Sequence, residues 1–438
     1  MERGNRGGKN IFIVIVLVVF VLFALVVLAA LGVFAGHSKD VYSPNSGSGL
    51  SSNVSTSSSS LSANVSDQTS ASSGESSSSV ASSSASTTSS KRSGSVTTAT
   101  QATTSGVIQL SNNNVEFIGR FLKTADGGYS FNWSGSTICA GFKGTEIGIN
   151  ITVSDGTTDY LNVTIDNNLP DMMTVTSDKR TYLLADGLKN SWHSVTIQKR
   201  TEGVQSSVLT FYGFNYLSGK PAYAPARKTR SIEFIGDSIT AGYGNMGSYG
   251  ASGFKLSQEN AGKTYGALAA QALNADSTII AISGAGMYQD LSGATDLILP
   301  KYYNQTLAKD FSVQAKWDFT KNVPNVTVIN LGTNDFQSGV NSGDYYKAYM
   351  NFLASVRSNY PNTYIVCAMG PMSILAWQSV CDVVAARTAK GDRKIATCAL
   401  TLDTSDTSLW GADGHPSAAG HVKLADKLAV LIREKLGW

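Results

Sequence analysis

The chain has 438 residues, 42% of them hydrophobic, and a formal net charge of +3 at pH 7. This length leaves room for two or three domains with separate cores. Because the charge is small, it offers no electrostatic basis for binding nucleic acid, and we expect no such partner. The four cysteines are sparse for a disulfide scaffold and lack metal-ligand spacing, although a bridge between Cys381 and Cys398 stays open.

The N-terminal residues predict a membrane segment. Residues 11–35 carry no charged side chain, and a helix of that length, at about 1.5 Å per residue, exceeds the roughly 30 Å core of a bilayer. The tip, residues 1–10, holds three basic side chains against one acid, which favours a cytoplasmic N-terminus. We expect a single-pass anchor in the cell membrane with the rest of the chain outside the cell, or a secreted protein if the segment is a cleaved signal.

Two segments with different compositions follow the apolar run. Residues 36–105 are dominated by serine, so they cannot bury enough apolar surface to offset the entropy of ordering, and we expect a disordered linker. Residues 106–222 alternate apolar and polar side chains, as in "EIGINITV" and "LNVTID", with turn signals such as "DNNLPD" between the runs. This pattern predicts an antiparallel β-sandwich.

The period changes again in residues 223–438. Apolar runs ("IEFI", "STIIAI", "NVTVINL", "TYIVCAM" and "KIATCAL") alternate with segments of helical spacing at residues 265–273, 345–356 and 424–432. Continuous apolar runs are typical of parallel strands that are buried on both faces. We therefore predict an α/β domain of three layers around a five-stranded parallel sheet.

Three polar residues stand at positions where this sheet can hold a reactive site. Ser238 follows the first strand, Asn334 follows the third in "NLGTND", and His415 precedes the last helix in "ADGHPS". Ligands of open α/β sheets bind beyond the carboxyl ends of the strands, and a Ser, a His and an amide meeting there favour acyl transfer. Ser238 alone would equally suit a helix cap, and His421 falls on the apolar face of the last helix, where we expect a core residue.

The set of motifs resembles the SGNH (GDSL-type) hydrolases, over roughly residues 228–438. The serine, glycine, asparagine and histidine blocks of that family correspond to "GDSIT", "SGAG", "GTND" and "DGHP". No G-x-S-x-G elbow of the α/β-hydrolase type is present. The upstream sequences "FIGR", "FNWSGSTICAGFKGTEIGINI" and "SWHSVTIQKRTEG" make the chain similar to the family-two carbohydrate esterases, which place a jelly-roll β-sandwich before an SGNH domain.

The resemblance implies a serine esterase that removes O-acetyl groups from polysaccharides or oligosaccharides such as xylan and mannan. Ser238 would form an acetyl-enzyme while His415 accepts its proton. The oxyanion would be held by the Ser238 N–H, the Asn334 side chain and a glycine N–H; Gly286 is favoured, with Gly284 as the alternative. Acyl transfer of this kind needs no metal or organic cofactor, and we expect none.

Two assignments around the histidine stay open. Most SGNH enzymes place the triad acid three residues before the histidine, where this chain has Ala412. Asp413, two residues before, is therefore the candidate acid, with a main-chain carbonyl as the alternative. Trp410 is a candidate sugar contact, and we expect Asp237 and Asp335 to stabilise turns rather than to react.

Other readings keep the fold and change the function. An SGNH esterase can also act on lipid esters or on acetyl groups of the cell's own wall. A carbohydrate-binding surface protein without esterase activity is a third option. The sequence leaves open the acetyl position, the oligomeric state and the role of the β-sandwich.

Overall fold

The computed structural model describes residues 106–107, 113–154, 156–204, 206–216, 222–308 and 315–438. These residues belong to one compact unit, Arg92–Trp438. The predicted tip, membrane segment and linker lie outside the described residues. Within the described ranges, no helix is both long enough and apolar enough to cross a membrane.

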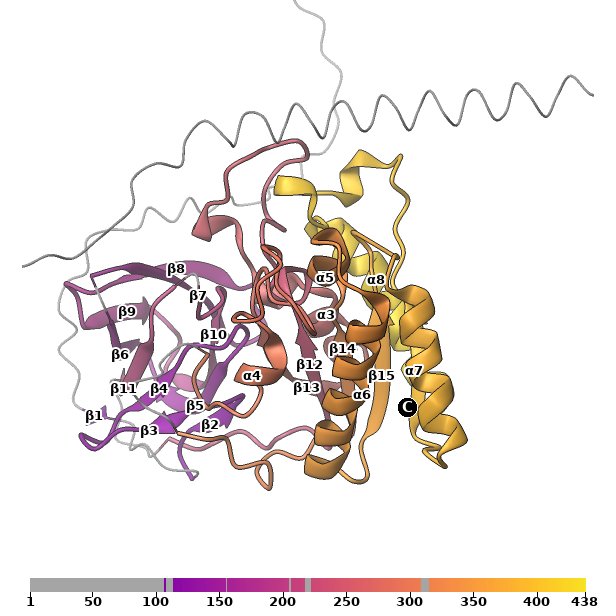
Figure 1. The fold of residues 1–438 in the computed structure, drawn as a ribbon. Helices are drawn as coiled ribbons and strands as arrows, with labels where there is room; N and C mark the ends of the chain where they lie inside the picture. The colour runs from indigo at the N-terminus through magenta and orange to yellow at the C-terminus, as the bar shows by residue number, and fades with distance from the viewer. Residues whose placement is uncertain (1–105, 108–112, 155, 205, 217–221, 309–314) are drawn as a thin grey trace, which may run out of the picture. The chain divides into compact units, whose positions relative to one another are not determined.

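Two antiparallel sheets form the first half of the unit (Figure 1). One sheet has the order β3-β4-β11-β6-β9, with β1 also paired to β11, and comprises β1 (Gly106–Val107), β3 (Leu122–Lys123), β4 (Tyr129–Phe131), β6 (Ile147–Val153), β9 (Thr181–Ala185) and β11 (Leu209–Tyr216). The other has the order β2-β5-β10-β7-β8 and comprises β2 (Glu116–Ile118), β5 (Thr137–Gly144), β7 (Thr158–Ile165), β8 (Asp171–Thr176) and β10 (Ser191–Lys199).

The alternation in the sequence explains how these sheets pack. On β6, Ile147, Ile149, Ile151 and Val153 are buried in a core that both sheets share. Successive residues of a strand point to opposite faces, so one face of each sheet can be apolar. The predicted antiparallel β domain is confirmed.

A five-stranded parallel sheet forms the second half. It contains β12 (Arg230–Gly236), β13 (Ala275–Ala281), β14 (Val326–Asn330), β15 (Tyr364–Met369) and β16 (Ile395–Ala399), in the order β13-β12-β14-β15-β16. Each strand coincides with one of the five apolar runs, and the predicted parallel sheet is confirmed. The order places β12, the first strand in sequence, between β13 and β14, which is the kind of switch point where α/β sheets bind ligands.

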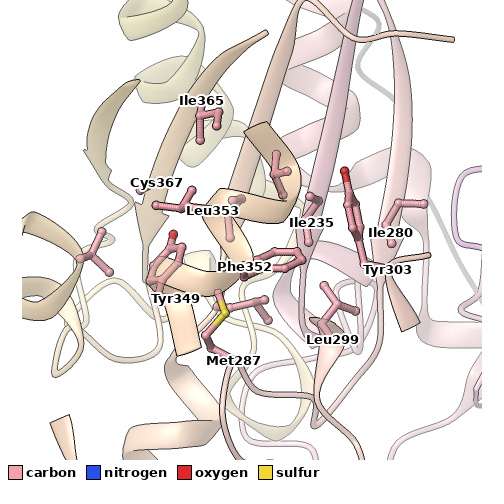
Figure 2. Close-up of a cluster of buried hydrophobic side chains, with 14 of the residues drawn as sticks. Ile235, Ile280, Met287, Leu299, Tyr303, Tyr349, Phe352, Leu353, Ile365 and Cys367 are labelled. Atoms are coloured by element: carbon pink, nitrogen blue, oxygen red, sulfur yellow. The ribbon is translucent and has the colours of Figure 1, made fainter. Parts of the chain in front are cut away.

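Helices cover both faces of this sheet. One face carries α6 (Ser342–Asn359) and α7 (Trp377–Ala389), and the other carries α3 (Tyr265–Ala272) and α8 (Ala418–Leu436). Neighbouring residues of β12 enter different cores, because Ile235 packs toward α6 (Figure 2) and Phe234 packs against the α3 side. Burial on both faces explains why the strands read as continuous apolar runs rather than as alternating ones.

Shorter elements complete the domain. They are the α-helices α2 (Ser238–Ala241), α4 (Leu299–Tyr302) and α5 (Thr333–Gln337), and the 3-10 helices η1 (Leu256–Gln258), η2 (Ala261–Lys263), η3 (Thr407–Leu409) and η4 (Ala412–Gly414). All four cysteines are free thiols, so Cys381 and Cys398 form no bridge.

Candidate active site

Ser238 lies in the turn that leaves the central strand of the parallel sheet. It is the first residue of α2, immediately after β12, and the cap of that helix is Asp237, whose side chain accepts the Ile239 N–H at 3.0 Å. Asp237 therefore stabilises the turn, as expected, and Ser238 is free of a capping role. Ser238 therefore lies beyond the carboxyl end of β12, at the edge of the parallel sheet that we call the rim.

His415 reaches the same point from the other end of the domain. Its Nε2 atom lies 2.8 Å from Ser238 Oγ, although the two residues are 177 positions apart. The residue follows η4, and its main-chain oxygen accepts the Gly411 N–H at 2.6 Å, which closes a tight loop before α8. The geometry is that of a nucleophile hydrogen-bonded to a general base.

The environment of His415 keeps its imidazole neutral. Burial lowers the pKa of this residue to about 4, against a smaller opposing effect of the hydrogen bond with the Asp413 carbonyl. A neutral imidazole can accept the proton of a hydroxyl, whereas an imidazolium cannot. His415 is therefore in its basic form over the whole neutral range.

Asp413 contacts His415 through its main chain. The Asp413 carbonyl oxygen lies 3.2 Å from His415 Nδ1, so a proton on Nδ1 is donated to that oxygen and leaves Nε2 free to accept from Ser238. The carboxylate lies elsewhere, where it accepts the Tyr243 hydroxyl and the Gly253 N–H, each at 3.2 Å. Asp413 has a φ of 50°, and this left-handed backbone turns its carbonyl toward the imidazole. The geometry corrects the assignment of the carboxylate as triad acid and matches the main-chain alternative.

The two glycines considered as oxyanion donors differ in the hydrogen bonds of their N–H groups. The Gly286 N–H faces the Leu297 carbonyl at 3.4 Å, in an isolated bridge beside Ile298. The Gly284 N–H, by contrast, has no acceptor among the described residues. Gly284 adopts a φ of 78°, which favours glycine, and lies three residues after the end of β13. The structure therefore favours Gly284 over Gly286 as the oxyanion donor.

A second acid explains why position 286 is glycine. The Asp335 carboxylate accepts the N–H groups of Met287, Tyr288 and Gln289 at 2.7–3.0 Å. A Cβ at Gly286 would lie 1.8 Å from the Gln289 carbonyl oxygen and 2.7 Å from Asp335 Oδ2, so only glycine fits beneath this carboxylate. Asp335 holds the turn, as expected.

Asn334 lies beside the same loop. It belongs to α5, directly after β14, and its Nδ2 donates to the Ala285 carbonyl at 2.8 Å. An amide nitrogen carries two N–H groups, so the second remains available to a developing oxyanion. Asn334 and the glycine turn are thus joined to each other before any substrate binds.

Two aromatic rings at the site were not anticipated. Tyr243 stacks on Phe254 with ring centroids 4.0 Å apart, and it also packs 4.5 Å from the His415 ring. Tyr243 follows Ser238 by five residues, and this proximity in the sequence is the only signal that could have pointed to it. Stacked rings beside a nucleophile suit the apolar faces of sugars.

The tryptophans lie in other surroundings. The Trp410 Nε1 donates to the Asp403 carbonyl at 3.1 Å, within the loop that precedes η4. Trp377 packs against the core under α6 and α7, and the Trp317 ring lies 5.3 Å from the Arg120 guanidinium. Among the described residues, the Trp410 side chain makes no hydrogen bond with Ser238 or His415, although its main chain pairs with Pro416 beside His415.

His421 behaves as the predicted core residue. It is fully buried, and its Nδ1 accepts the Tyr265 N–H at 3.0 Å. Burial lowers its pKa to about 3, so it is neutral. In the part of the chain that the structure describes, no group of three or more His, Cys, Asp or Glu side chains is arranged to hold a metal ion.

Comparison with known proteins matches each half of the described chain to a family model. The carbohydrate esterase 2 N-terminal domain matches residues 117–225, and the GDSL-like lipase/acylhydrolase family matches residues 234–423. A solved family two carbohydrate esterase from Clostridium thermocellum, in complex with cellohexaose, is 36% identical with a TM-score of 0.70, covering 74% of this chain and 99% of that one.

Two curated relatives agree. The cellulase/esterase CelE of Acetivibrio thermocellus is 36% identical over 333 residues, which are 75% of this chain but only 40% of that protein. An acetylxylan esterase / glucomannan deacetylase of Cellvibrio japonicus is 33% identical over 267 residues, 56% of this chain and 70% of that protein. The fold and the site define a carboxylic ester hydrolase of the GDSL class. The chain belongs to carbohydrate esterase family 2.

Proposed function

We propose that this protein hydrolyses O-acetyl esters of polysaccharides through an acetyl-enzyme on Ser238. The observation that carries the proposal is the 2.8 Å contact between Ser238 Oγ and His415 Nε2. Family membership supports an ester substrate. The curated relatives that act on xylan and glucomannan support acetylated plant polysaccharide as its class.

The reaction follows from the positions of the groups. Ser238 Oγ attacks the acetyl carbon while its proton passes to His415 Nε2, and the oxyanion is held by the N–H groups of Ser238 and Gly284 and by the Asn334 amide. Collapse breaks the bond between the acetyl carbon and the sugar oxygen, which takes the proton from His415. A water molecule, deprotonated by His415, then releases acetate and restores Ser238.

The aromatic pair favours a sugar beside the ester. The centroid of the Tyr243 ring lies 4.0 Å from that of Phe254 and 4.5 Å from that of His415, so aromatic rings lie next to the general base. Aromatic rings of this kind suit the apolar face of a pyranose, and a sugar held there would lie beside Ser238. A lipid ester, or an acetyl group on wall polymers, is the competing substrate.

The proposal extends to the rest of the chain. The strand orders β4-β11-β6-β9 and β5-β10-β7-β8 are those expected for a jelly roll. Residues 11–35 would anchor the enzyme in the membrane, and the serine-rich residues 36–105 would hold the catalytic unit away from it, outside the cell.

The test is acetate release by the full-length protein from acetyl-xylan, acetyl-glucomannan, acetylated peptidoglycan and a short lipid ester, with p-nitrophenyl acetate as a general substrate. We expect turnover of the two polysaccharides and a loss of at least about 10⁴-fold in Ser238→Ala. Because Ser238 is not the helix cap, this variant should keep the wild-type melting temperature. Undiminished turnover by Ser238→Ala would disprove the mechanism. Turnover of only the lipid ester would disprove the substrate.

A further inference from the structure

One acidic side chain of the β-sandwich reaches the half of the molecule that holds the candidate active site. Glu202 follows β10, and its Oε2 accepts the Ser283 N–H at 2.6 Å across 81 residues of sequence. Ser283 directly precedes Gly284, the favoured oxyanion donor, and Glu202 is fully buried. A contact of this length between a carboxylate and an N–H is strong, because the charge assists the hydrogen bond.

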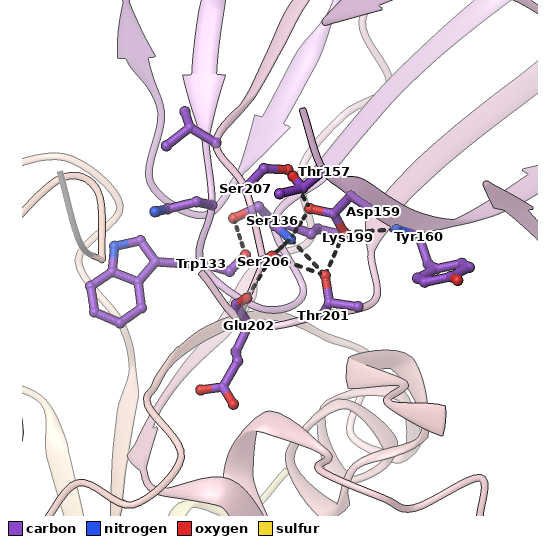
Figure 3. A network of polar contacts seen from close by, with 12 residues as sticks. Trp133, Ser136, Thr157, Asp159, Tyr160, Lys199, Thr201, Glu202, Ser206 and Ser207 are labelled. Carbon is purple, nitrogen blue, oxygen red and sulfur yellow. Dashed lines mark hydrogen bonds and ion pairs between the residues drawn. The ribbon is translucent and has the colours of Figure 1, made fainter. Parts of the chain in front are cut away.

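The segment that carries Glu202 is itself fixed by a buried polar network (Figure 3). The Lys199 ammonium donates to the Asp159 carboxylate at 2.7 Å, to Thr201 at 2.7 Å and to Ser206 at 2.8 Å. Ser206 in turn donates to the Glu202 carbonyl at 2.6 Å. Figure 3 shows the Glu202 side chain leaving this network with its carboxylate on the far side, away from Lys199.

We propose that Glu202 is a positioning residue for the oxyanion turn, so that the β-sandwich is a structural part of the active site. The chain of contacts runs from the Lys199 network through the Glu202 main chain to its carboxylate, and from there to the Ser283 N–H. The turn at Ser283 and Gly284 sets where the Gly284 N–H points. The inference rests on the proposed esterase function, since it assigns the sandwich a part in that reaction.

The charges around Glu202 make the contact sensitive to pH. Burial raises the pKa of Glu202 to about 7, opposed by the hydrogen bonds with Ser283 and by the Lys199 charge. The titratable groups that interact with Glu202, directly or through its neighbours, are Lys199, Asp159, Glu259, Asp237 and Tyr243. Its second oxygen, Oε1, has no hydrogen-bond partner among the described residues. The ionised form, which predominates above pH 7, is the stronger acceptor for the Ser283 N–H.

Two substitutions in the full-length protein test the role. Glu202→Ala removes the acceptor and leaves a buried N–H unpaired, so kcat on p-nitrophenyl acetate should fall about 10- to 100-fold with KM nearly unchanged. Glu202→Gln keeps a neutral acceptor and resembles the protonated form. The ratio of wild-type kcat to that of Glu202→Gln should be near one at pH 6 and rise to about fivefold at pH 8.5. Both proteins keep Asp237, whose pKa is raised to about 7 mainly by burial and in smaller part by the Glu202 charge, so Asp237 enters the ratio only through the part of its shift that Glu202 causes.

Glu233→Gln is the matched control. Glu233 lies on β12 and, like Glu202, is buried where the sandwich meets the α/β half. Its carboxylate accepts from Arg120 at 3.2 Å and from the Tyr303 hydroxyl at 2.8 Å. This variant should lose stability while its kcat stays at the wild-type value at both pH values. The proposal is overturned if Glu202→Ala keeps the wild-type kcat, if the Glu202→Gln ratio is independent of pH, or if Glu233→Gln loses as much kcat.

A second measurement separates this inference from the esterase function. If the wild-type protein releases no acetate from any substrate, the proposed function fails, and hydrogen exchange still reports on the turn. The Ser283–Gly286 amides should exchange faster in Glu202→Ala than in the wild type and in Glu233→Gln. Equal exchange in the three proteins would disprove the positioning role.

Discussion

Two buried polar regions of this molecule differ in how completely their groups are paired. In the sandwich, the Lys199 ammonium has three donors, and all three find acceptors on Asp159, Thr201 and Ser206. At the rim, by contrast, the Gly284 N–H has no acceptor among the described residues. A fully paired cluster fixes the backbone, whereas unpaired donors that are already in place can serve a reacting group.

The sandwich network should respond to a lost charge with a loss of stability. Asp159→Asn leaves the buried Lys199 ammonium without its counter-charge, and breaking such a pair should reduce the free energy of unfolding by about 3–5 kcal/mol. The matched control is Asp318→Asn, since Asp318 is half-exposed and 4.0 Å from Lys321, and it should leave the free energy of unfolding nearly unchanged. Denaturant unfolding of both variants measures the difference. Equal, small effects would mean that the buried network does not hold the sandwich.

Substitutions at the rim should lower kcat more than they lower stability. Asn334→Ala removes the proposed side-chain donor to the oxyanion, so kcat should fall about 10²–10³-fold, while KM for p-nitrophenyl acetate changes little. The loss in unfolding free energy should be smaller than in Asp159→Asn, because only the bond to the Ala285 carbonyl disappears. Steady-state kinetics and denaturant unfolding on the same preparations provide the comparison. A variant that is destabilised but fully active would reverse the assignment of the two regions.

The strands of both halves and three residues of the site could be predicted from the sequence. Each of the five parallel strands reads as an apolar run because helices bury both faces of the sheet, and Ser238, Asn334 and His415 stand where those strands and the last helix meet the rim. The sandwich strands showed the alternation that one buried face requires.

The features of the site that could not be predicted from the sequence depend on contacts between residues far apart in the chain or on backbone angles. Nothing in the sequence distinguishes Glu202 from the other acids, and its contact with Ser283 exists only in the folded chain. The stacking of Phe254 on Tyr243 likewise depends on the conformation of the loop between them. The choice between Gly284 and Gly286 depends on which of the two N–H groups faces the Leu297 carbonyl, and this is the Gly286 N–H. The main-chain role of Asp413 requires a left-handed φ of 50°, which residue spacing does not reveal.

The two neutral histidines predict a stability that falls in acid. The pKa of His421 is near 6.5 in the unfolded chain and is lowered to about 3 by burial, so between these values the unfolded state binds more protons and is favoured as pH drops. From pH 7 to pH 5, His421 should account for a loss of about 2 kcal/mol. His421→Gln, which keeps an acceptor for the Tyr265 N–H, should lack that part of the slope in unfolding measured at the two pH values.

His193 offers a control of opposite sign. Burial lowers its pKa, but hydrogen bonds with the Lys189 carbonyl and Asp166 outweigh this and raise it. Its contribution to stability is therefore present below about pH 6.5 and lost as pH rises through the raised value. His193→Gln should steepen the loss of stability in acid, where His421→Gln flattens it. Parallel behaviour of the two variants would contradict the assignment of His421 as neutral.

The smallest expected effect concerns Asp413. If its carboxylate oriented the imidazole, Asp413→Asn would lower kcat about 10⁴-fold, as in hydrolases that use a carboxylate. Here the main-chain carbonyl lies 3.2 Å from His415 Nδ1, and Asn adopts a left-handed φ nearly as readily as Asp. We therefore expect Asp413→Asn to lose less than about fivefold in kcat, from weaker contacts to Tyr243 and Gly253. Asp413→Val, whose branched side chain disfavours the left-handed φ, should turn the carbonyl away and lose far more. Equal, large losses in both variants would restore the carboxylate to the triad.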